Sequence, residues 1–191
     1  RLSSCGRPPP WVHVALLDPE CNPVPRGEPG EICVRGPLVM KGYKDMPEQT
    51  AEAFAGGWLH TGDVGKLDDD GFLYIVDRTK DMIVTGGFNV FPREVEDVLA
   101  THEAVGQVVV IGVPDEQWGE AVKAVVVLKP GFEAGDELVV SMQALVKEAK
   151  GSVQSPKSVD FVDAIPLTPV GKPDKKAVRA SYWEGSDRVV G

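Results

Sequence analysis

The spacing of hydrophobic positions changes near the middle of the chain. In the first 77 residues, apolar and polar side chains alternate in short runs, among them 12–16 and 31–35, and prolines and glycines separate these runs. Such a period of two predicts half-buried β-strands. Asp70-Gly71 stands between two further apolar runs, which is a strong signal for a hairpin turn. One helix is expected within 47–55. This part of the sequence predicts a small antiparallel β unit.

Beyond residue 82, apolar positions recur at helical spacing or fill continuous runs. Pro92 suits the first turn of a helix, and Val95, Val98 and Leu99 then share one face that is expected to be buried. The acidic residues of this helix are predicted to be exposed: Glu94, Glu96 and Asp97.

The rest of the second half predicts strands and one further helix. The β-branched runs 105–113 and 121–128 have the length of strands, and 159–162 predicts a shorter one. Between the runs 121–128 and 159–162, a helix is predicted to follow an N-cap, Asp136, and to end at Gly151. The predicted fold class is therefore α+β: a small antiparallel β subdomain followed by a compact α+β domain.

The two halves meet at a pentad of alternating charge, Asp77-Arg78-Thr79-Lys80-Asp81. A hydrated joint between two differently built halves is typical of a domain boundary, although a plain solvated turn has the same composition. We place the boundary so that residues 1–79 form the β-rich unit and residues 80–191 the α+β unit.

Composition narrows the possible functions. The net charge of −9 argues against nucleic acid or an anionic membrane as a general partner. Cys5, Cys21 and Cys33 are odd in number and form no close-spaced metal pair, so we predict a reducing, cytoplasmic location and no metal site. Apolar runs such as 108–111 are too short for a transmembrane segment. Because the chain starts at Arg1 rather than Met, a preceding segment is expected.

Four short stretches carry residues that suit a nucleotide or its reaction. Asp63, expected in a turn between strands, could accept hydrogen bonds from ribose hydroxyls, although structural turn aspartates are common. Arg78 offers a guanidinium to ribose or phosphate oxygens, or forms only a surface ion pair with Asp77 or Asp81. Lys172 lies in a proline-stiffened loop, where it could neutralise a transferred phosphoryl group or simply remain solvated. Gly86-Gly87 lets a ligand approach the backbone, as glycines in strand-edge turns also do.

In this order and spacing, these stretches resemble motifs of the AMP-forming acyl-CoA synthetases, within the adenylate-forming enzyme superfamily. Thr61-Gly62-Asp63 is similar to the family's ribose-binding motif, and residues 77–81 resemble its hinge motif. Residues 86–92 are similar to the segment that lines the pantetheine channel. Their sequence, Gly-Gly-Phe-Asn-Val-Phe-Pro, resembles that of fatty-acid–CoA ligases in particular. Two further stretches complete the match: 30–43, like the strand-and-turn motif before the nucleotide site, and 166–172, like the loop with the catalytic lysine.

The resemblance implies the C-terminal part of an ATP-dependent enzyme. Such an enzyme activates a carboxylic acid, here expected to be a fatty acid, as an acyl-adenylate and transfers the acyl group to CoA. ATP, Mg²⁺ and CoA are thereby implied. The implied site residues are Lys172 as the catalytic residue, Asp63 and Arg78 for the nucleotide, Lys80 as the hinge, and Gly86, Gly87 and Phe88 along the CoA channel.

The family's phosphate loop, adenine-stacking segment and acyl pocket are missing from these residues. They are expected in a large N-terminal part that also holds most Mg²⁺ contacts, so the chain alone should be inactive. Residues 1–79 would then be the closing β subdomain of that part, and residues 80–191 the mobile C-terminal domain. Asn89 stands where some members place a basic residue near the CoA phosphates, which leaves those contacts open. The missing pocket also leaves the acid unidentified.

Two other interpretations share these motifs. An adenylation domain that loads a carrier protein differs only in its thiol acceptor. A non-catalytic nucleotide-binding relative would not require Lys172, whose presence therefore favours an enzyme.

Overall fold

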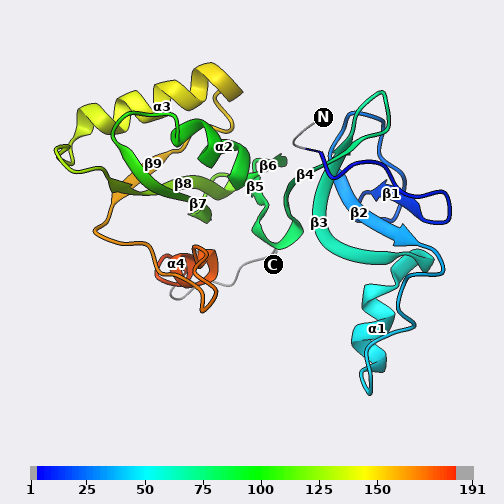
Figure 1. Ribbon diagram of the computed structural model, residues 1–191. Coiled ribbons are helices and arrows are strands. Elements are labelled where there is room, and N and C mark those ends of the chain that lie inside the picture. Colours follow the sequence, from blue (N-terminus) through cyan, green and yellow to red (C-terminus); the bar gives the residue numbers. More distant parts are fainter. Residues whose placement is uncertain (1–3, 184–191) are drawn as a thin grey trace. The chain divides into compact units, whose positions relative to one another are not determined.

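The computed structural model describes residues 4–183, and its fold is α+β, as the sequence predicts (Figure 1). Contacts divide the chain into two compact units, Arg1–Thr79 and Lys80–Gly191, which we call the first and the second unit. No helix within the described residues has both the length and the apolar character needed to cross a membrane.

Over residues 4–79, the first unit forms a four-stranded antiparallel sheet whose strands follow chain order. Strands β1 (His13–Leu17), β2 (Gly30–Arg35), β3 (Leu59–Leu67) and β4 (Leu73–Arg78) pair in that sequence. The predicted hairpin joins β3 to β4, with Gly71 at a φ of +80°. The core of this unit consists of buried apolar side chains: Leu16, Leu17, Ile32, Cys33 and Val64.

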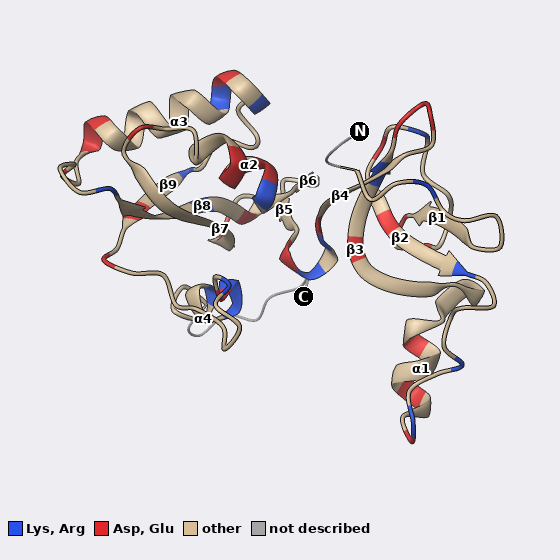
Figure 2. Cartoon of the chain, in the orientation of Figure 1, with Lys and Arg blue, Asp and Glu red and all other residues tan. Residues whose placement is uncertain are grey.

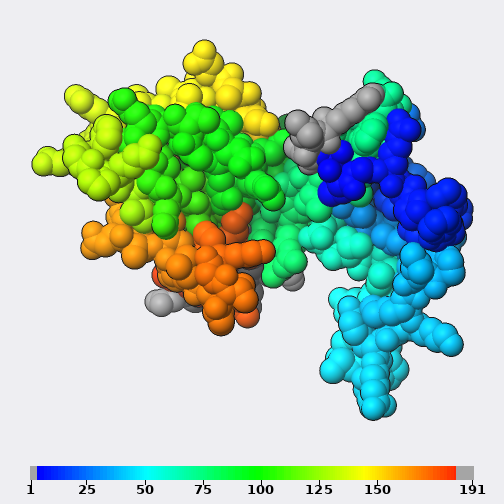
Figure 3. All heavy atoms as spheres, in the orientation of Figure 1, coloured from blue at the N-terminus to red at the C-terminus, as the bar shows by residue number. Residues whose placement is uncertain are grey.

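Helix α1 (Pro47–Ala53) lies within the predicted range and leads into a single 3₁₀ turn, η1 (Ala55–Gly57). No residue of α1 is buried, and the space-filling view shows this segment, in cyan, projecting from its unit (Figure 3). The segment just before α1 exposes large apolar side chains: Leu38, Met40, Tyr43 and Met46.

Across residues 80–183, the second unit contains a mixed sheet in the order β6-β5-β8-β7, with β9 added in parallel to β8. Strand β7 extends beyond its predicted end and includes Pro114. A proline is tolerated there because β7 lies at the edge of the sheet, where a missing N–H breaks no ladder. The strand bounds are Ile83–Thr85 for β5, Phe88–Val90 for β6, Val105–Asp115 for β7, Gly119–Leu128 for β8 and Ser158–Phe161 for β9.

Helices cover both faces of this sheet. Helices α2 (Pro92–Leu99) and α3 (Asp136–Lys150) lie on one face, and α4 (Lys175–Ala180) lies on the other (Figure 1). On β7, Val110 packs with the cluster under α2 and α3, whereas Val109 and Ile111 pack with α4. Because both faces are buried, the strands read as continuous apolar runs rather than as alternating ones.

One helix terminus differs from the sequence prediction, and one short helix was not predicted. Asp136 is the first residue of α3 and not its N-cap, because Gly135 occupies the cap position. Its carboxylate still favours the positive end of the helix dipole. Gly151 ends α3 at a φ of +88°, as predicted. The sequence did not predict α4, which begins after Asp174, whose Oδ1 accepts a hydrogen bond of 3.0 Å from the N–H of Ala177.

Candidate functional site

Asp63 and Arg78 lie opposite each other on neighbouring strands of the first unit. They are register partners in the β3–β4 pair, and Nε of Arg78 is 3.4 Å from Oδ1 of Asp63. The side chains retain 34% exposure for Asp63 and 61% for Arg78, so both groups remain accessible to a ligand. An ion pair this exposed contributes little to stability. The structure therefore brings the two predicted nucleotide-binding residues together without burying either.

Asp63 does not lie in a turn between strands, so that expectation was wrong. It lies inside β3, in a bulge where residues 61–63 stand opposite Ile32 alone. The Thr61 hydroxyl donates to the Ile32 carbonyl (2.7 Å) and accepts from the N–H of Asp63 (3.2 Å). Gly62 adopts a φ of +73°. These bonds replace the regular ladder, and bulges of this kind redirect a side chain.

Glu31 supports the bulge from β2. Its Oε1 accepts the N–H of Gly62 (2.9 Å), and its Oε2 lies 2.8 Å from Nδ1 of His60. Sγ of Cys33 lies 3.4 Å from the same nitrogen, so three potential metal ligands are grouped here. Burial, reinforced by the charge of Glu31, raises the pKa of the Cys33 thiol to about 12. Because these groups bond one another and the thiol stays protonated, we interpret the cluster as support for the bulge.

Lys172 lies at the end of a closed loop in the second unit. The N–H of Thr168 donates to the Lys172 carbonyl (2.7 Å), and the N–H of Lys172 donates to the Thr168 hydroxyl (3.2 Å). Gly171, at a φ of +78°, makes the turn between them. The side chain of Lys172 is exposed and has no hydrogen-bond or ion-pair partner within residues 4–183. The backbone is thus fixed while the ammonium group is available to a ligand.

Acidic residues predominate on α2 and basic residues on α4 (Figure 2). An ion pair links the two helices. Glu96 was predicted to be exposed, but its side chain is only 18% exposed. Its Oε1 accepts the N–H of Val110 (2.7 Å) and lies 2.9 Å from Nζ of Lys175. The helical pattern alone could not identify these partners, because they come from β7 and α4.

Lys80 lies in η2 (Thr79–Asp81), a single turn of 3₁₀ helix at the junction of the two units. Its side chain is exposed. The next residue, Asp81, accepts a hydrogen bond of 3.0 Å from Nη2 of Arg179 in α4. The hinge function of Lys80 stays a prediction.

Gly86 and Gly87 form the two-residue loop between β5 and β6. Their φ angles of +56° and +82° are those of a type I′ hairpin turn. A Cβ at Gly86 would lie 2.6 Å from Cε3 of Trp118, whereas a Cβ at Gly87 would meet nothing within 4 Å. Phe88 and Trp118 are 61% and 46% exposed. They add apolar surface beside the glycines, and Trp118 is a neighbour that the sequence motif did not reveal.

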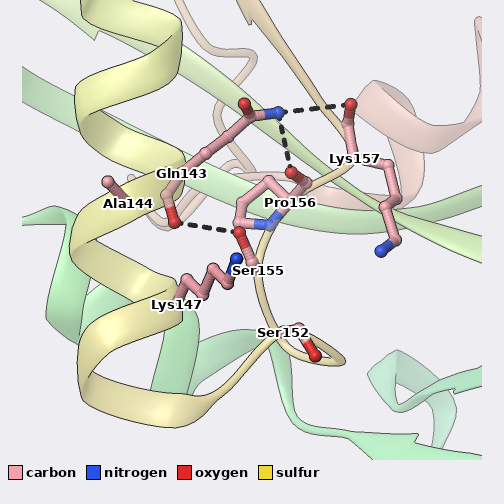
Figure 4. A pocket seen from close by; sticks show the side chains of 7 residues that line it. All are labelled: Gln143, Ala144, Lys147, Ser152, Ser155, Pro156 and Lys157. Atoms are coloured by element: carbon pink, nitrogen blue, oxygen red, sulfur yellow. Dashed lines mark hydrogen bonds between the residues drawn. The ribbon is translucent and has the colours of Figure 1, made fainter.

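A hollow of about 370 Å³ lies between α3 and the segment that follows it (Figure 4). Its wall is held together by hydrogen bonds from Gln143 to the carbonyls of Pro156 (2.9 Å) and Lys157 (3.3 Å). The Ser155 hydroxyl donates to the Gln143 carbonyl (2.9 Å). None of the predicted site residues lines this hollow. We assign these polar groups to the packing of α3 rather than to the site.

Two family models match the chain. The model of the AMP-binding enzyme matches residues 1–44, and that of the AMP-binding enzyme C-terminal domain matches residues 94–172.

Curated relatives extend the match to the whole chain. A medium/long-chain-fatty-acid–CoA ligase, FadD8, of Mycobacterium tuberculosis is 61% identical over 100% of this chain and 34% of its own length. A fatty acid–[acyl-carrier-protein] ligase, ScoC, of Streptomyces coeruleorubidus is 38% identical over 99% of this chain and 36% of its own length. The chain thus spans about a third of the length of these relatives.

Solved structures include the amide bond synthetase McbA of Marinactinospora thermotolerans. It superimposes with a TM-score of 0.82 at 45% sequence identity, over 95% of this chain and 36% of that protein. Over this region, the two proteins therefore share both their fold and much of their sequence.

Proposed function

Because the chain belongs to the AMP-binding enzyme family, we propose that it is the C-terminal part of an AMP-forming acid–CoA ligase. The ligase activates a fatty acid with ATP, as an acyl-adenylate, and transfers the acyl group to the thiol of CoA. The observation that carries this proposal is the 61% identity, along the whole chain, with a medium/long-chain-fatty-acid–CoA ligase. Identity to the carrier-protein ligase is 38%, which favours CoA over a carrier protein as the acceptor.

In the first half-reaction, an oxygen of the carboxylate attacks the α-phosphorus of ATP, and pyrophosphate leaves. Asp63 accepts hydrogen bonds from the ribose hydroxyls, and Arg78 donates to ribose oxygens; their accessible pairing across β3 and β4 supports this. Lys172 offsets the repulsion between the carboxylate and the phosphate. Its exposed ammonium group on a hydrogen-bonded loop supports this assignment.

In the second half-reaction, the sulfur of CoA attacks the acyl carbon and AMP leaves. The second unit turns about Lys80, which withdraws Lys172 and brings the Gly86-Gly87 turn to the acyl-adenylate. The pantetheine arm then passes along Gly86, Gly87 and Phe88, where the exposed aromatic ring of Phe88 supports an apolar contact.

The contacts to the triphosphate, adenine and acyl chain belong to a preceding N-terminal part. That part also holds Mg²⁺, which offsets charge on the triphosphate in this reaction. The exposed apolar residues before α1 support such a neighbour, and include Leu38 and Met46. We retain a cytoplasmic location as part of this proposal.

The test replaces Lys172 by alanine in the full-length protein and measures each half-reaction separately. Acyl-adenylate formation should fall by about 10²–10³, the usual loss when one preorganised electrostatic contact is removed. Thioester formation from added acyl-adenylate should persist, because Lys172 is withdrawn in that step.

Lys176→Ala is the matched control, since Lys176 is a nearby exposed lysine. It should keep both half-reactions. Equal losses of the two half-reactions in Lys172→Ala would contradict the assigned function of this lysine.

A further inference from the structure

We propose that Lys175 and Arg179 are positioning residues that hold α4, and with it the Lys172 loop: Lys175 holds it to α2, and Arg179 holds it to the segment beside Lys80. This inference rests on the proposed catalytic function of Lys172. It concerns contacts within the second unit, and each contact involves α4.

The loop and α4 form one continuous structure. Only Pro173 and Asp174 separate Lys172 from the first residue of α4. Proline restricts the backbone, and the N–H of Asp174 donates to the Pro166 carbonyl at 2.8 Å. The Asp174 carboxylate also caps α4. The position of Lys172 is therefore set by the position of α4.

Helix α4 needs tertiary contacts to hold that position. It has six residues, and helices this short are not stable on their own. Val178 is its one buried residue and packs with Val109 and Ile111 of β7. Apolar packing is not directional, so polar contacts are needed to fix the orientation of the helix.

The first polar contact lies at the start of α4. Nζ of Lys175 is 2.9 Å from Oε1 of Glu96, and each side chain is only 18% exposed. The same oxygen accepts the N–H of Val110. One carboxylate thereby joins α2, β7 and α4, next to the loop that carries Lys172.

The second contact ties α4 to the predicted hinge segment. Arg179 lies four residues after Lys175, so the two side chains share one face of the helix. Nη2 of Arg179 is 3.0 Å from Oδ1 of Asp81, and both side chains are 15% exposed. Nε of Arg179 is buried without a hydrogen-bond partner among the described residues, so its charge relies on Asp81. Because Asp81 follows Lys80 directly, a rotation at Lys80 moves Asp81, α4 and Lys172 together.

The test compares Arg179→Met and Lys175→Met in the full-length protein. Methionine keeps an unbranched apolar side chain and removes the charge. Single-turnover formation of acyl-adenylate should fall roughly 10–100-fold, because displacement of a catalytic group by about 1 Å costs up to 10²-fold. The KM for ATP and thioester formation from added acyl-adenylate should change less than about twofold, within the effect of a weak contact. Arg179→Lys should restore most of the rate, since a single nitrogen contacts Asp81.

Lys150→Met is the matched control. It breaks another ion pair of the same unit, Lys150 with Glu94 at 3.3 Å, which joins α3 to α2 away from the loop. This variant should retain both half-reactions. If Arg179→Met and Lys175→Met match this control, or lose both half-reactions equally, the positioning proposal is overturned. Lys172→Ala is measured in parallel: if it keeps adenylation, the proposed function itself fails.

Discussion

Single residues of the proposed site are presented by local irregularities of the backbone. Asp63 leaves the regular ladder of β3 through the bulge at Gly62, and Lys172 follows the turn made by Gly171. In both places a hydroxyl completes the backbone hydrogen bonding, from Thr61 and Thr168 respectively. Each functional side chain is thus directed outward by a backbone that is already bonded.

Gly87 permits a test at this scale. Gly87→Leu should leave adenylation nearly intact and raise the KM for CoA or abolish thioester formation, because the side chain would obstruct the pantetheine. The folded hairpin has room for the added Cβ, which at Gly87 would meet nothing within 4 Å. The measurement is the rate of each half-reaction in the full-length protein as CoA is varied.

The competing explanation is that the protein needs glycine at position 87 only for its backbone conformation, with a φ of +82°. Asparagine adopts positive φ more readily than leucine does. If Gly87→Asn restores thioester formation, backbone conformation explains the effect and the channel does not.

The sequence identified the accessible candidates better than their neighbours. Asp63, Arg78 and Lys172 are exposed or half-buried, and local motifs were enough to single them out. Glu96 was misassigned because its partners, Val110 and Lys175, are distant in the chain. The sequence motifs missed Glu31 and Trp118 for the same reason. Pairing of β2 with β3 brings Glu31 to Gly62, and pairing of β5 with β8 brings Trp118 to Gly86.

Among the elements, α4 has the most consequence for the proposed site. The chain after it is also held: the Tyr182 hydroxyl donates to Oδ2 of Asp160 on β9 at 2.7 Å. Oδ1 of Asp160 in turn lies 2.8 Å from Nζ of Lys123 on β8. Burial opposes ionisation of Asp160, but the hydrogen bonds from Lys123 and Tyr182 outweigh it and lower the pKa of this carboxyl.

This contact predicts a pH dependence of stability. Burial, followed by the hydrogen bond to Asp160, raises the pKa of Tyr182 from 10.0 to about 12. The protonated phenol is therefore favoured in the folded state, and its stabilisation is complete below pH 10 and lost as pH rises through 12. Tyr182→Phe should lower the free energy of unfolding by roughly 1.5–3 kcal/mol at neutral pH, as expected for a hydrogen bond to a charged group.

Urea unfolding of both proteins across the alkaline range provides the measurement. The difference in free energy of unfolding between wild type and Tyr182→Phe should shrink between pH 10 and 12. Taking this difference cancels the pH-dependent contributions of groups that both proteins contain, such as the Cys33 thiol. A difference that stays constant over this range would contradict the assigned hydrogen bond.

Within the second unit, the long elements were predictable from the sequence and so was the four-residue strand β9, whereas β5, β6 and α4 were not. The long elements have enough apolar positions to show a helical period or a continuous apolar run; these elements are β7, β8, α2 and α3. Strands β5 and β6 have three residues each and α4 has six, so their conformations depend on neighbours rather than on local pattern. The bulge in β3 was read as a turn because Gly62 and Asp63 are also common turn residues.

At the scale of the whole molecule, the proposed site residues are divided between the two units. Asp63 and Arg78 belong to the first unit, and Lys172 and Gly87 belong to the second. The two proposed half-reactions require Lys172 and the Gly87 turn to reach the nucleotide one after the other. Alternation about Lys80 is therefore the central claim for the full-length enzyme.

Lys80→Pro tests this claim most directly. Proline fixes φ near −65°, which a single 3₁₀ turn tolerates, but it prevents the backbone change that a hinge requires. Adenylation needs Lys172 near the nucleotide, so we expect the trapped protein to keep that step. Thioester formation should fall by several orders of magnitude, because the second arrangement cannot be reached. Lys80→Ala keeps both dihedral angles free and should resemble wild type in both steps.

The decisive measurement is the single-turnover rate of each half-reaction in full-length Lys80→Pro. Our account predicts near-normal formation of acyl-adenylate together with a severe loss of thioester formation. A plain surface turn would instead change stability by about 1 kcal/mol and affect both steps alike. If Lys80→Pro slows the two half-reactions by the same factor, Lys80 is not the hinge and the alternation assigned to this chain is contradicted.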